Sequence, residues 1–283
     1  MIAIIDYGAG NLASVKKAFD YIGVDSVITD DANVVLNADG VVLPGVGAIS
    51  YAMDCLKSKG MDEVVGPLNY SDLEREGLLI EGFDYLSTFE EQYNHPYYQK
   101  LIENFGFTKD VDWIEHRLTI NKEKYEKLSR VSDMLLARGN FKVVKPLKPK
   151  QFYKQYGDQF FSLLDETYDK IYGTVPFSQG MKDLILHNYA PIVNKHYMRI
   201  VVNNDNKIIA FALAFPNVAE AMQMRNGHLR LIPILKLLHT VRHPKIIDLG
   251  LVGVLPSEAL GGSQIVLFKL LAEQIIKDNI QYF

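Results

Sequence analysis

The sequence predicts a mixed α/β protein, in which a short parallel-sheet segment is followed by a longer region of helices and paired strands. Over the first 50 residues, compact apolar runs bounded by Gly and Asp alternate with helical periodicity. Residues 141–283 instead give the order strand, two helices, two hairpin strands, strand, helix. The 283 residues, 48% hydrophobic and 23% charged, suffice for one large or two medium domains.

The N-terminal elements read as alternating strands and helices. The opening "IAIID" is a strand broken by glycine, and apolar residues at helical spacing follow it, from Leu12 to Phe19. Short apolar runs bounded by Asp and Gly then resemble strands of a largely parallel sheet. The further elements predicted here are strands at 26–30 and 40–45, a helix at 50–60 closed by Gly60, and a strand at 62–69.

The middle of the chain is more charged and aromatic. Pro96 opens a helix that Gly106 ends, and a second helix stops at Gly139 and Asn140. The Lys- and Pro-rich stretch 142–151 marks a boundary near Phe141. The predicted elements are a strand or extended segment at 77–83, helices at 96–106 and 122–140, and an alternating strand at 113–120.

The last part begins with a strand at 141–145 and helices at 151–172 and 178–190. A hairpin follows, whose strands at 197–204 and 207–215 meet at an Asn-Asp-Asn turn. A basic apolar helix, a strand at 245–254, a Gly-containing turn and a helix at 263–278 complete the order.

Composition excludes several functional classes. Thirty Lys and Arg against thirty-four Asp and Glu give a net charge of −4, so nucleic acid is not an expected partner. The single cysteine, Cys55, excludes an internal disulfide and a Cys-rich zinc site. The cytoplasm is the expected location, because the N-terminus lacks a basic leader and no apolar run predicts a transmembrane segment.

The N-terminal residues resemble a known enzyme family. "IAIIDYGAGNLASVKKAFDYIG" and "ADGVVLPGVGAISYAMDCL" are similar to the start of class I glutamine amidotransferases, in particular the glutaminase subunits of imidazole glycerol phosphate synthase. The resemblance covers residues 1–55 and implies that the loop Pro44–Ala48 lies beside a thioester site, where it lends an oxyanion-hole N–H. The family's nucleophilic cysteine on a glycine elbow and its His-x-Glu pair have no counterpart here. Cys55 lies in a helical context, so glutamine hydrolysis is not expected.

Residues 54–283 resemble a family of GNAT-like N-acyltransferases built from two tandem halves. The stretch 56–140 looks like the back end of a first half, and 141–283 like a second half that is truncated at its C-terminus. The two resemblances meet near residues 49–60, and whether that seam is natural is left open. We expect the N-terminal segment to cover the sheet edge left open by the missing first strands.

The acyltransferase resemblance implies a binding site for acetyl-CoA or another acyl-CoA as substrate. The strand at 245–254 would contribute Val252 and Val254, and Gly261, Gly262 and Ser263 would hold a diphosphate with backbone N–H groups at a helix N-terminus. Glu258 stands in that turn and would weaken anion binding.

Asp248 on the same strand is the candidate catalytic base for deprotonating an amine acceptor, either a small molecule or a lipid-like amine. No metal is expected. His239 and His243 share a helix face, but Pro244 follows at once and no third ligand is near in sequence. We interpret them as a solvated face.

The segment 224–243 interleaves leucines and isoleucines with Arg225, Arg230, Lys236 and Arg242. Such a segment can make peripheral contact with a membrane or cap a lipid-like acceptor. Core packing is the favoured interpretation, because Pro233 interrupts the helical stripe.

The sequence therefore predicts an N-acyltransferase that transfers an acyl group from acyl-CoA to an amine, with weak or no turnover. Two alternatives stay open. One is a fragment of a glutamine amidotransferase subunit, a class that serves histidine biosynthesis, without a competent glutaminase site. The other is a non-catalytic acyl-CoA-binding or lipid-binding protein.

Overall fold

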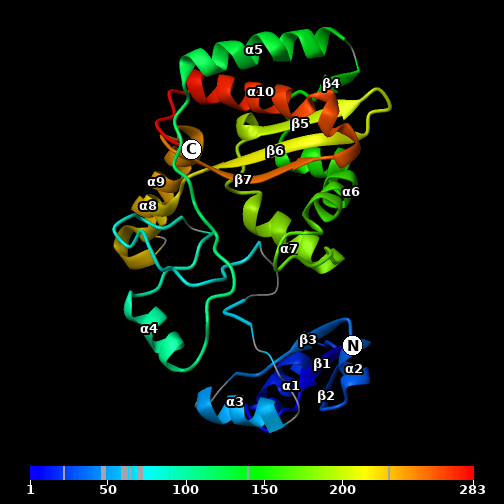
Figure 1. Ribbon diagram of the computed structural model, residues 1–283, viewed down its shortest axis with the longest axis vertical. Helices are drawn as coiled ribbons and strands as arrows, with labels where there is room; N and C mark the ends of the chain where they lie inside the picture. Colours follow the sequence, from blue (N-terminus) through cyan, green and yellow to red (C-terminus); the bar gives the residue numbers. More distant parts are fainter. Residues whose placement is uncertain are drawn as a thin grey trace. The chain divides into compact units, whose positions relative to one another are not determined.

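The computed structural model describes residues 1–21, 23–45, 49–58, 63, 65–68, 73–88, 90–138, 140–228 and 230–283. The chain forms two compact units, Met1–Gly66 and Pro67–Phe283. The protein is of the mixed α/β class, as the sequence predicts, with ten α-helices and two sheets among the described residues (Figure 1).

The first unit is built on a three-stranded parallel sheet in the order β2-β1-β3. Ala3 and Ile4 of β1 are fully buried, as expected for the central strand. The strands predicted at the N-terminus, at 26–30 and at 40–45 are confirmed, as are both predicted helices. The elements are β1 (Ile2–Ile5), α1 (Leu12–Tyr21), β2 (Ser26–Thr29), α2 (Ala32–Leu36), β3 (Gly40–Val42) and α3 (Ile49–Ser58).

Two details differ from the sequence expectation in this unit. Helix α2 was not predicted; Asp31 begins it, because its side chain accepts the N–H of Asn33 at 2.8 Å. The strand expected at 62–69 is absent from the described residues of that stretch, which are 63 and 65–68. Residues 62, 64 and 69 lie outside the described part of the chain, and so does Gly60, the predicted end of the helix.

The second unit contains a four-stranded antiparallel sheet in the order β4-β5-β6-β7. The predicted succession of elements after residue 121 is confirmed. The elements are α4 (Tyr97–Asn104), α5 (Lys122–Ala137), β4 (Phe141–Val143), α6 (Pro149–Tyr168), α7 (Gln179–Tyr189), β5 (Met198–Asn203), β6 (Ile208–Pro216), α8 (Ala219–Gln223), α9 (Leu231–Arg242), β7 (Ile247–Val254) and α10 (Ser263–Lys277), with 3-10 turns at Lys195–Tyr197, Met224–Gly227 and Pro256–Gly261.

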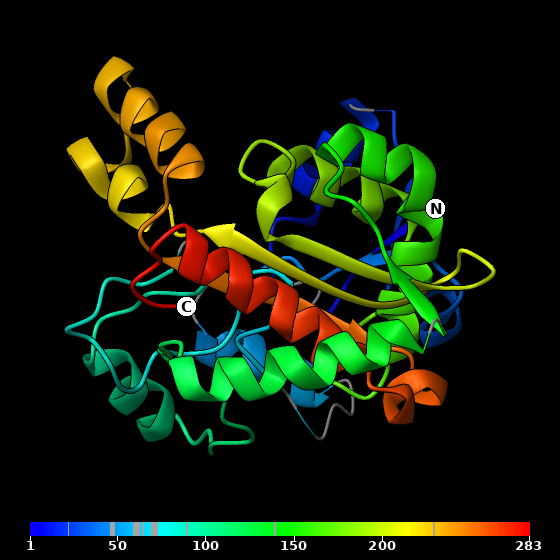
Figure 2. The same cartoon turned by 90° about the horizontal axis from the view of Figure 1, so that it is seen from above.

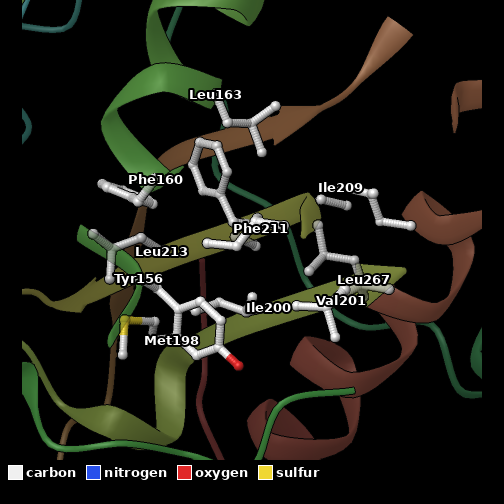
Figure 3. Packing of buried hydrophobic residues seen from close by; sticks show 14 of the residues in the cluster. Tyr156, Phe160, Leu163, Met198, Ile200, Val201, Ile209, Phe211, Leu213 and Leu267 are labelled. Carbon is white, nitrogen blue, oxygen red and sulfur yellow. The ribbon is translucent and has the colours of Figure 1, made fainter. Parts of the chain in front are cut away.

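Helices cover both faces of this sheet. All nine residues of β6 are buried, which a continuous apolar run predicts for a strand with two covered faces. From α6, the ring of Phe160 meets Phe211 of β6 with centroids 4.8 Å apart, whereas Leu267 reaches the same core from α10 (Figure 3). Helix α5 packs along α10 (Figures 1 and 2). Each such buried side chain stabilises the unit by about 1.5–3 kcal/mol.

Strand β7 lies at the edge of this sheet, whereas the acyltransferase resemblance implies that the strand at 245–254 is central; that expectation is wrong. The terminal residues meet it at a parallel bridge between Ile246 and Tyr282. They then turn to Leu118, whose N–H and C=O both bond to Phe283, at 2.8 and 3.0 Å. The C-terminal residues therefore border the start of β7. Farther along β7, other elements border this edge of the sheet.

The alternating strand expected at 113–120 is wrong. These residues have no regular structure, and their backbone pairing with the chain terminus is confined to Leu118. Alternation predicts a strand only where a partner strand lies alongside. The strand or extended segment expected at 77–83 is not a strand: the stretch bends at Gly77 and Glu81, and both glycines in it have positive φ. Its centre is held by a side chain, since Asn94 accepts the N–H of Leu79 at 2.7 Å and donates to its C=O at 3.1 Å.

Candidate functional site

Asp248 lies near the start of β7, opposite the end of β6. It is paired in register with Phe215, and Asn217, just after β6, donates its backbone N–H to Ile246 at 3.0 Å. The side-chain Nδ2 of Asn217 donates to both carboxylate oxygens of Asp248, each at 3.0 Å. Two adjacent strand ends therefore fix the orientation of this carboxylate.

The environment of Asp248 acts on its acidity in both directions. Burial raises the pKa of Asp248, and the negative charge of Glu115 raises it further. The hydrogen bonds from Asn217 lower the pKa, because they stabilise the ionised form. Asp248, predicted as a catalytic base from the sequence, thus occupies a site where a carboxylate is shielded and held in place.

A second carboxyl group, Glu90, lies within range of the charge of Asp248 and was missed by sequence reasoning. Burial raises the pKa of Glu90 from 4.5 to about 8, and the charge of Asp248 is the next cause. Its Oε1 atom is shielded from solvent and has no hydrogen-bond partner among the described residues. Glu90 can therefore accept or release a proton near pH 8, which suits a general base.

Tyr189 of α7 lies near Glu90 and against β6. Its ring packs against Phe215, with centroids 5.3 Å apart, and its hydroxyl donates to the C=O of Leu73 at 3.5 Å. Burial raises the pKa of Tyr189 to about 12, and the charge of Glu90 contributes next. Tyr189 therefore keeps its proton and acts as a hydrogen-bond donor.

Strand β7 carries a bulge two residues after Asp248. Leu213 pairs with Leu251 and Ala214 with Leu249, so Gly250 is an extra residue outside the ladder. Only glycine fits, because a Cβ atom at this position would lie 2.5 Å from Cε2 of Phe215. The bulge therefore leaves Gly250 outside the regular pairing of β6 with β7, two residues after Asp248.

The residues predicted to contact the acyl arm also lie on β7. Val252 has its backbone engaged by Tyr168 of α6: the Val252 N–H donates to the hydroxyl at 3.1 Å, and the hydroxyl donates to the Val252 C=O at 3.2 Å. Val254, farther along, is half-buried and packs against the main core. An acyl-CoA arm running along this edge would have to displace the Tyr168 hydroxyl.

The predicted diphosphate turn lies at the start of α10, as expected. Gly262 has φ of 83°, a conformation that glycine adopts without strain, and a Cβ there would lie 2.7 Å from Leu135 of α5. Ser263 is fully buried and its hydroxyl has no partner among the described residues. Gly261 is exposed, and a Cβ there would meet Glu258 at 3.8 Å. The packing of α5 thus encloses part of the turn, and Gly261 is its open position.

The loop beginning at Pro44 lies against the end of β1 in the first unit. The hydroxyl of Tyr7 donates to the Pro44 C=O at 2.6 Å, and a Cβ at Gly10 would lie 2.7 Å from that oxygen. Residues 46–48, which the amidotransferase resemblance assigns to an oxyanion hole, lie outside the described residues.

Cys55 lies inside α3, as the sequence predicts, and not on a strand-to-helix turn. It faces Gly8, where an added Cβ would be 3.6 Å from Sγ, and it contacts Tyr51, whose pKa is raised by a hydrogen bond with Cys55. No histidine accompanies it among the described contacts. This environment does not activate a thiol for nucleophilic attack.

His239 and His243 are brought together, with ring centroids 5.1 Å apart, and both are exposed. Over the described part of the chain, no three His, Cys, Asp or Glu side chains form a group that could hold a metal ion. The interpretation of a solvated pair agrees with this arrangement.

Comparison with known proteins finds an amidotransferase-like segment. The chain is 51% identical over 65 residues to imidazole glycerol phosphate synthase subunit HisH of Chlorobaculum tepidum, which is 23% of this chain and 32% of that protein. It is 52% identical over 61 residues to the HisH subunit of Bacillus cereus, 22% of this chain and 29% of that protein, and 54% over 61 residues to that of Bacillus mycoides, again 22% and 29%. The chain therefore spans about a third of the length of these curated relatives. No family model matches the chain.

Proposed function

We propose that the first unit is an amidotransferase-like segment that does not hydrolyse glutamine by itself. The similarity to HisH subunits over about a quarter of the chain supports the relationship. The position of Cys55 within α3, with Tyr51 and Gly8 as its neighbours, supports the loss of the reaction. A glutaminase requires a thiolate on an exposed turn with a histidine to activate it.

An ammonia-release assay with glutamine tests this proposal on the full-length protein. We expect no release above the buffer background, and no difference between the parent and Cys55→Ala. Ammonia release that disappears in Cys55→Ala would contradict the proposal.

For the larger unit we propose a second function, the transfer of an acyl group from an acyl-CoA to an amine. The paired carboxyl groups of Glu90 and Asp248 carry this proposal, together with the predicted order of elements from β4 to α10 and the bulge at Gly250. The acidic surroundings also favour an acceptor that is a cation before it reacts.

In the proposed reaction the amine attacks the thioester carbonyl carbon, so a C–N bond forms and the C–S bond breaks. Glu90 takes the proton lost by the amine, and the thiolate of CoA leaves and is protonated by solvent. The backbone amide at the Gly250 bulge would polarise the carbonyl oxygen. Burial, and next the charge of Asp248, raise the pKa of Glu90 to about 8, which matches the proton acceptor to an amine at mildly basic pH.

Thiol release from acetyl-CoA and longer acyl-CoAs, measured with a panel of mono- and polyamines, tests the proposal. Activity should rise with pH through a midpoint near 8 and be lost in Glu90→Gln, whereas Asp248→Asn should move the midpoint downward. A midpoint unmoved in Asp248→Asn would refute the assigned pairing.

Acyl-CoA binding is tested separately by calorimetry with Gly261→Asp. This variant adds negative charge to the open position of the turn, and Gly262 is unsuitable because any side chain there would collide with Leu135. Binding that survives Gly261→Asp unchanged would place the ligand elsewhere, and no binding by the parent would remove the proposed activity.

A further inference from the structure

Helix α9 turns its apolar side away from the protein. Leu231, Leu235 and Leu238 are spaced by four and three residues, so they form one stripe along the helix. Pro233, on the opposite side, is buried. The exposed fractions of the apolar side chains are 72% for Leu231, 52% for Ile232, 40% for Ile234, 56% for Leu235 and 48% for Leu238.

This exposure corrects the expectation of core packing for the segment. Pro233 does not interrupt the stripe, because it occupies the first turn of α9, where proline needs no hydrogen-bond donor. Helix α8 and the turn Met224–Gly227 precede α9, and the three elements form an extension between β6 and β7 that projects beyond the end of the sheet (Figure 2).

Basic side chains border the apolar stripe. Arg225 and Arg230 are exposed at its N-terminal side, and Arg242 continues the stripe at its C-terminal end. The ion pairs found among the described residues include none of these three arginines. The acidic group nearby, Glu220 of α8, pairs with Lys236 at 3.5 Å. The surface is therefore locally cationic on a protein whose net charge is −4.

A two-fold dimer through this face is disfavoured by the same charges. In such a dimer the patch meets its own copy, so the arginines of one chain would approach those of the other. Nucleic acid is also disfavoured, because the centre of the face is apolar and not basic. An anionic lipid surface satisfies both features at once: the acyl region takes the leucines and the headgroups take the arginines.

We propose that the outward face of α9, bordered by Arg225, Arg230 and Arg242, docks the protein onto the surface of anionic lipid bilayers. The helix lies in the interface and does not cross it; none of the described helices is long and apolar enough to span a membrane. The docking requires neither of the functions proposed above. It would, however, bring Asp248, which follows α9 closely in the chain, near amphiphilic amines of the membrane.

Vesicle sedimentation tests the proposal. The full-length protein is mixed with vesicles of pure phosphatidylcholine or of phosphatidylcholine with phosphatidylglycerol in equal parts, at about 0.1 M salt. We expect binding to the anionic vesicles and at least about tenfold weaker partitioning at about 0.5 M salt, because screening weakens the arginine contribution.

Two sets of variants separate the apolar and basic contributions. Leu235→Glu with Leu238→Glu should abolish binding, and replacing Arg225, Arg230 and Arg242 together by Gln should lower it at least about tenfold. Leu101→Glu and Leu184→Glu are the matched controls, since these leucines are 57% and 50% exposed on other helices. Equal losses in the controls would overturn the proposal.

A fluorescent probe gives a second readout. Trp113 is the single tryptophan of the chain, so Leu231→Trp in a Trp113→Phe background reports on α9 alone. Its emission should shift to the blue with anionic vesicles and be quenched by brominated acyl chains. The proposal would be overturned if the protein failed to bind anionic vesicles or bound pure phosphatidylcholine equally well. It would also be overturned by a dimer in lipid-free solution that Leu235→Glu dissociates, because a second copy of the chain would then be the partner of this face.

Discussion

The hydroxyl of Tyr168 bridges the backbone of Val252, accepting its N–H at 3.1 Å and donating to its C=O at 3.2 Å. The two groups lie on the edge of β7 that faces away from β6, so one side chain of α6 replaces a neighbouring strand at this position. The edge is protected from pairing with another chain, and the same atoms are withheld from any extended ligand.

Tyr168→Phe is expected to destabilise the protein by about 1–3 kcal/mol, because both backbone groups lose their partner. If acyl-CoA uses this edge, the same variant should bind it more tightly than the parent. Urea unfolding and calorimetry with acetyl-CoA measure the two effects. Tyr153→Phe, also on α6, is the control, and an equal loss of stability there would show that the hydroxyl bridge contributes little.

Glu90 gives the stability of the second unit a dependence on pH. The pKa of Glu90 is about 8 in the folded protein and ordinarily 4.5, so the folded state holds this proton more tightly than the unfolded chain. The contribution of Glu90 to the free energy of unfolding is therefore fully present below about pH 4.5. It is lost as pH rises towards 8, and the loss from this group is at most about 4–5 kcal/mol.

Glu90→Gln should remove that loss, so the variant should exceed the parent in stability at pH 9 and resemble it at pH 5. Urea unfolding across this range gives the comparison, with Glu103→Gln of the exposed helix α4 as the control. A parent and a variant whose stabilities run parallel from pH 5 to 9 would contradict the assigned burial of Glu90.

Sequence patterns correctly predicted the helices and strands that are determined by residues within or next to the element itself. The apolar run at 207–215 predicted the strand that the structure shows as β6, and Pro96 marked the start of α4. Helix α2 was missed because its central Val34 and Val35 favour a strand, although Asp31 offered a capping signal.

The sequence-based predictions failed where the structure of a segment depends on contacts with residues far away in the chain. Residues 113–120 alternate as a strand does, but their available partner is the terminal residue Phe283. Asp248 could be named from its place on β7, whereas Glu90 lies in an ordinary charged stretch and acquires its raised pKa only when folding buries its carboxyl group and brings it within range of the charge of Asp248. In α9, amphipathic spacing was visible, but which side would face solvent was not.

Asn94 is expected to organise the irregular segment 77–83. Asn94→Ala removes both contacts with Leu79, at 2.7 and 3.1 Å, and should cost about 2–3 kcal/mol because Asn94 is 8% exposed and water does not readily replace it. Asn94→Asp keeps the acceptor and loses the donor, so an intermediate loss is expected. Chemical unfolding and limited proteolysis near Ile80 measure the effect; cleavage at the parent rate in Asn94→Ala would exclude this role.

Gly262 joins the 3-10 turn to α10 under the side chain of Leu135. Gly262→Ala should destabilise the protein by about 2–4 kcal/mol, since alanine is strained at φ of 83° and its Cβ would lie 2.7 Å from Leu135 Cδ1. Gly261→Ala is the matched control next to it, with a Cβ that meets Glu258 at an ordinary 3.8 Å, and should change stability by less than about 1 kcal/mol. Combining Gly262→Ala with Leu135→Ala separates the two causes of the lost stability. The loss caused by the clash with Leu135 should be relieved, and the loss caused by the strained backbone of residue 262 should remain. Additive losses in the double variant, measured by urea unfolding, would mean that Leu135 and Gly262 do not constrain each other, and that the turn is open to a ligand.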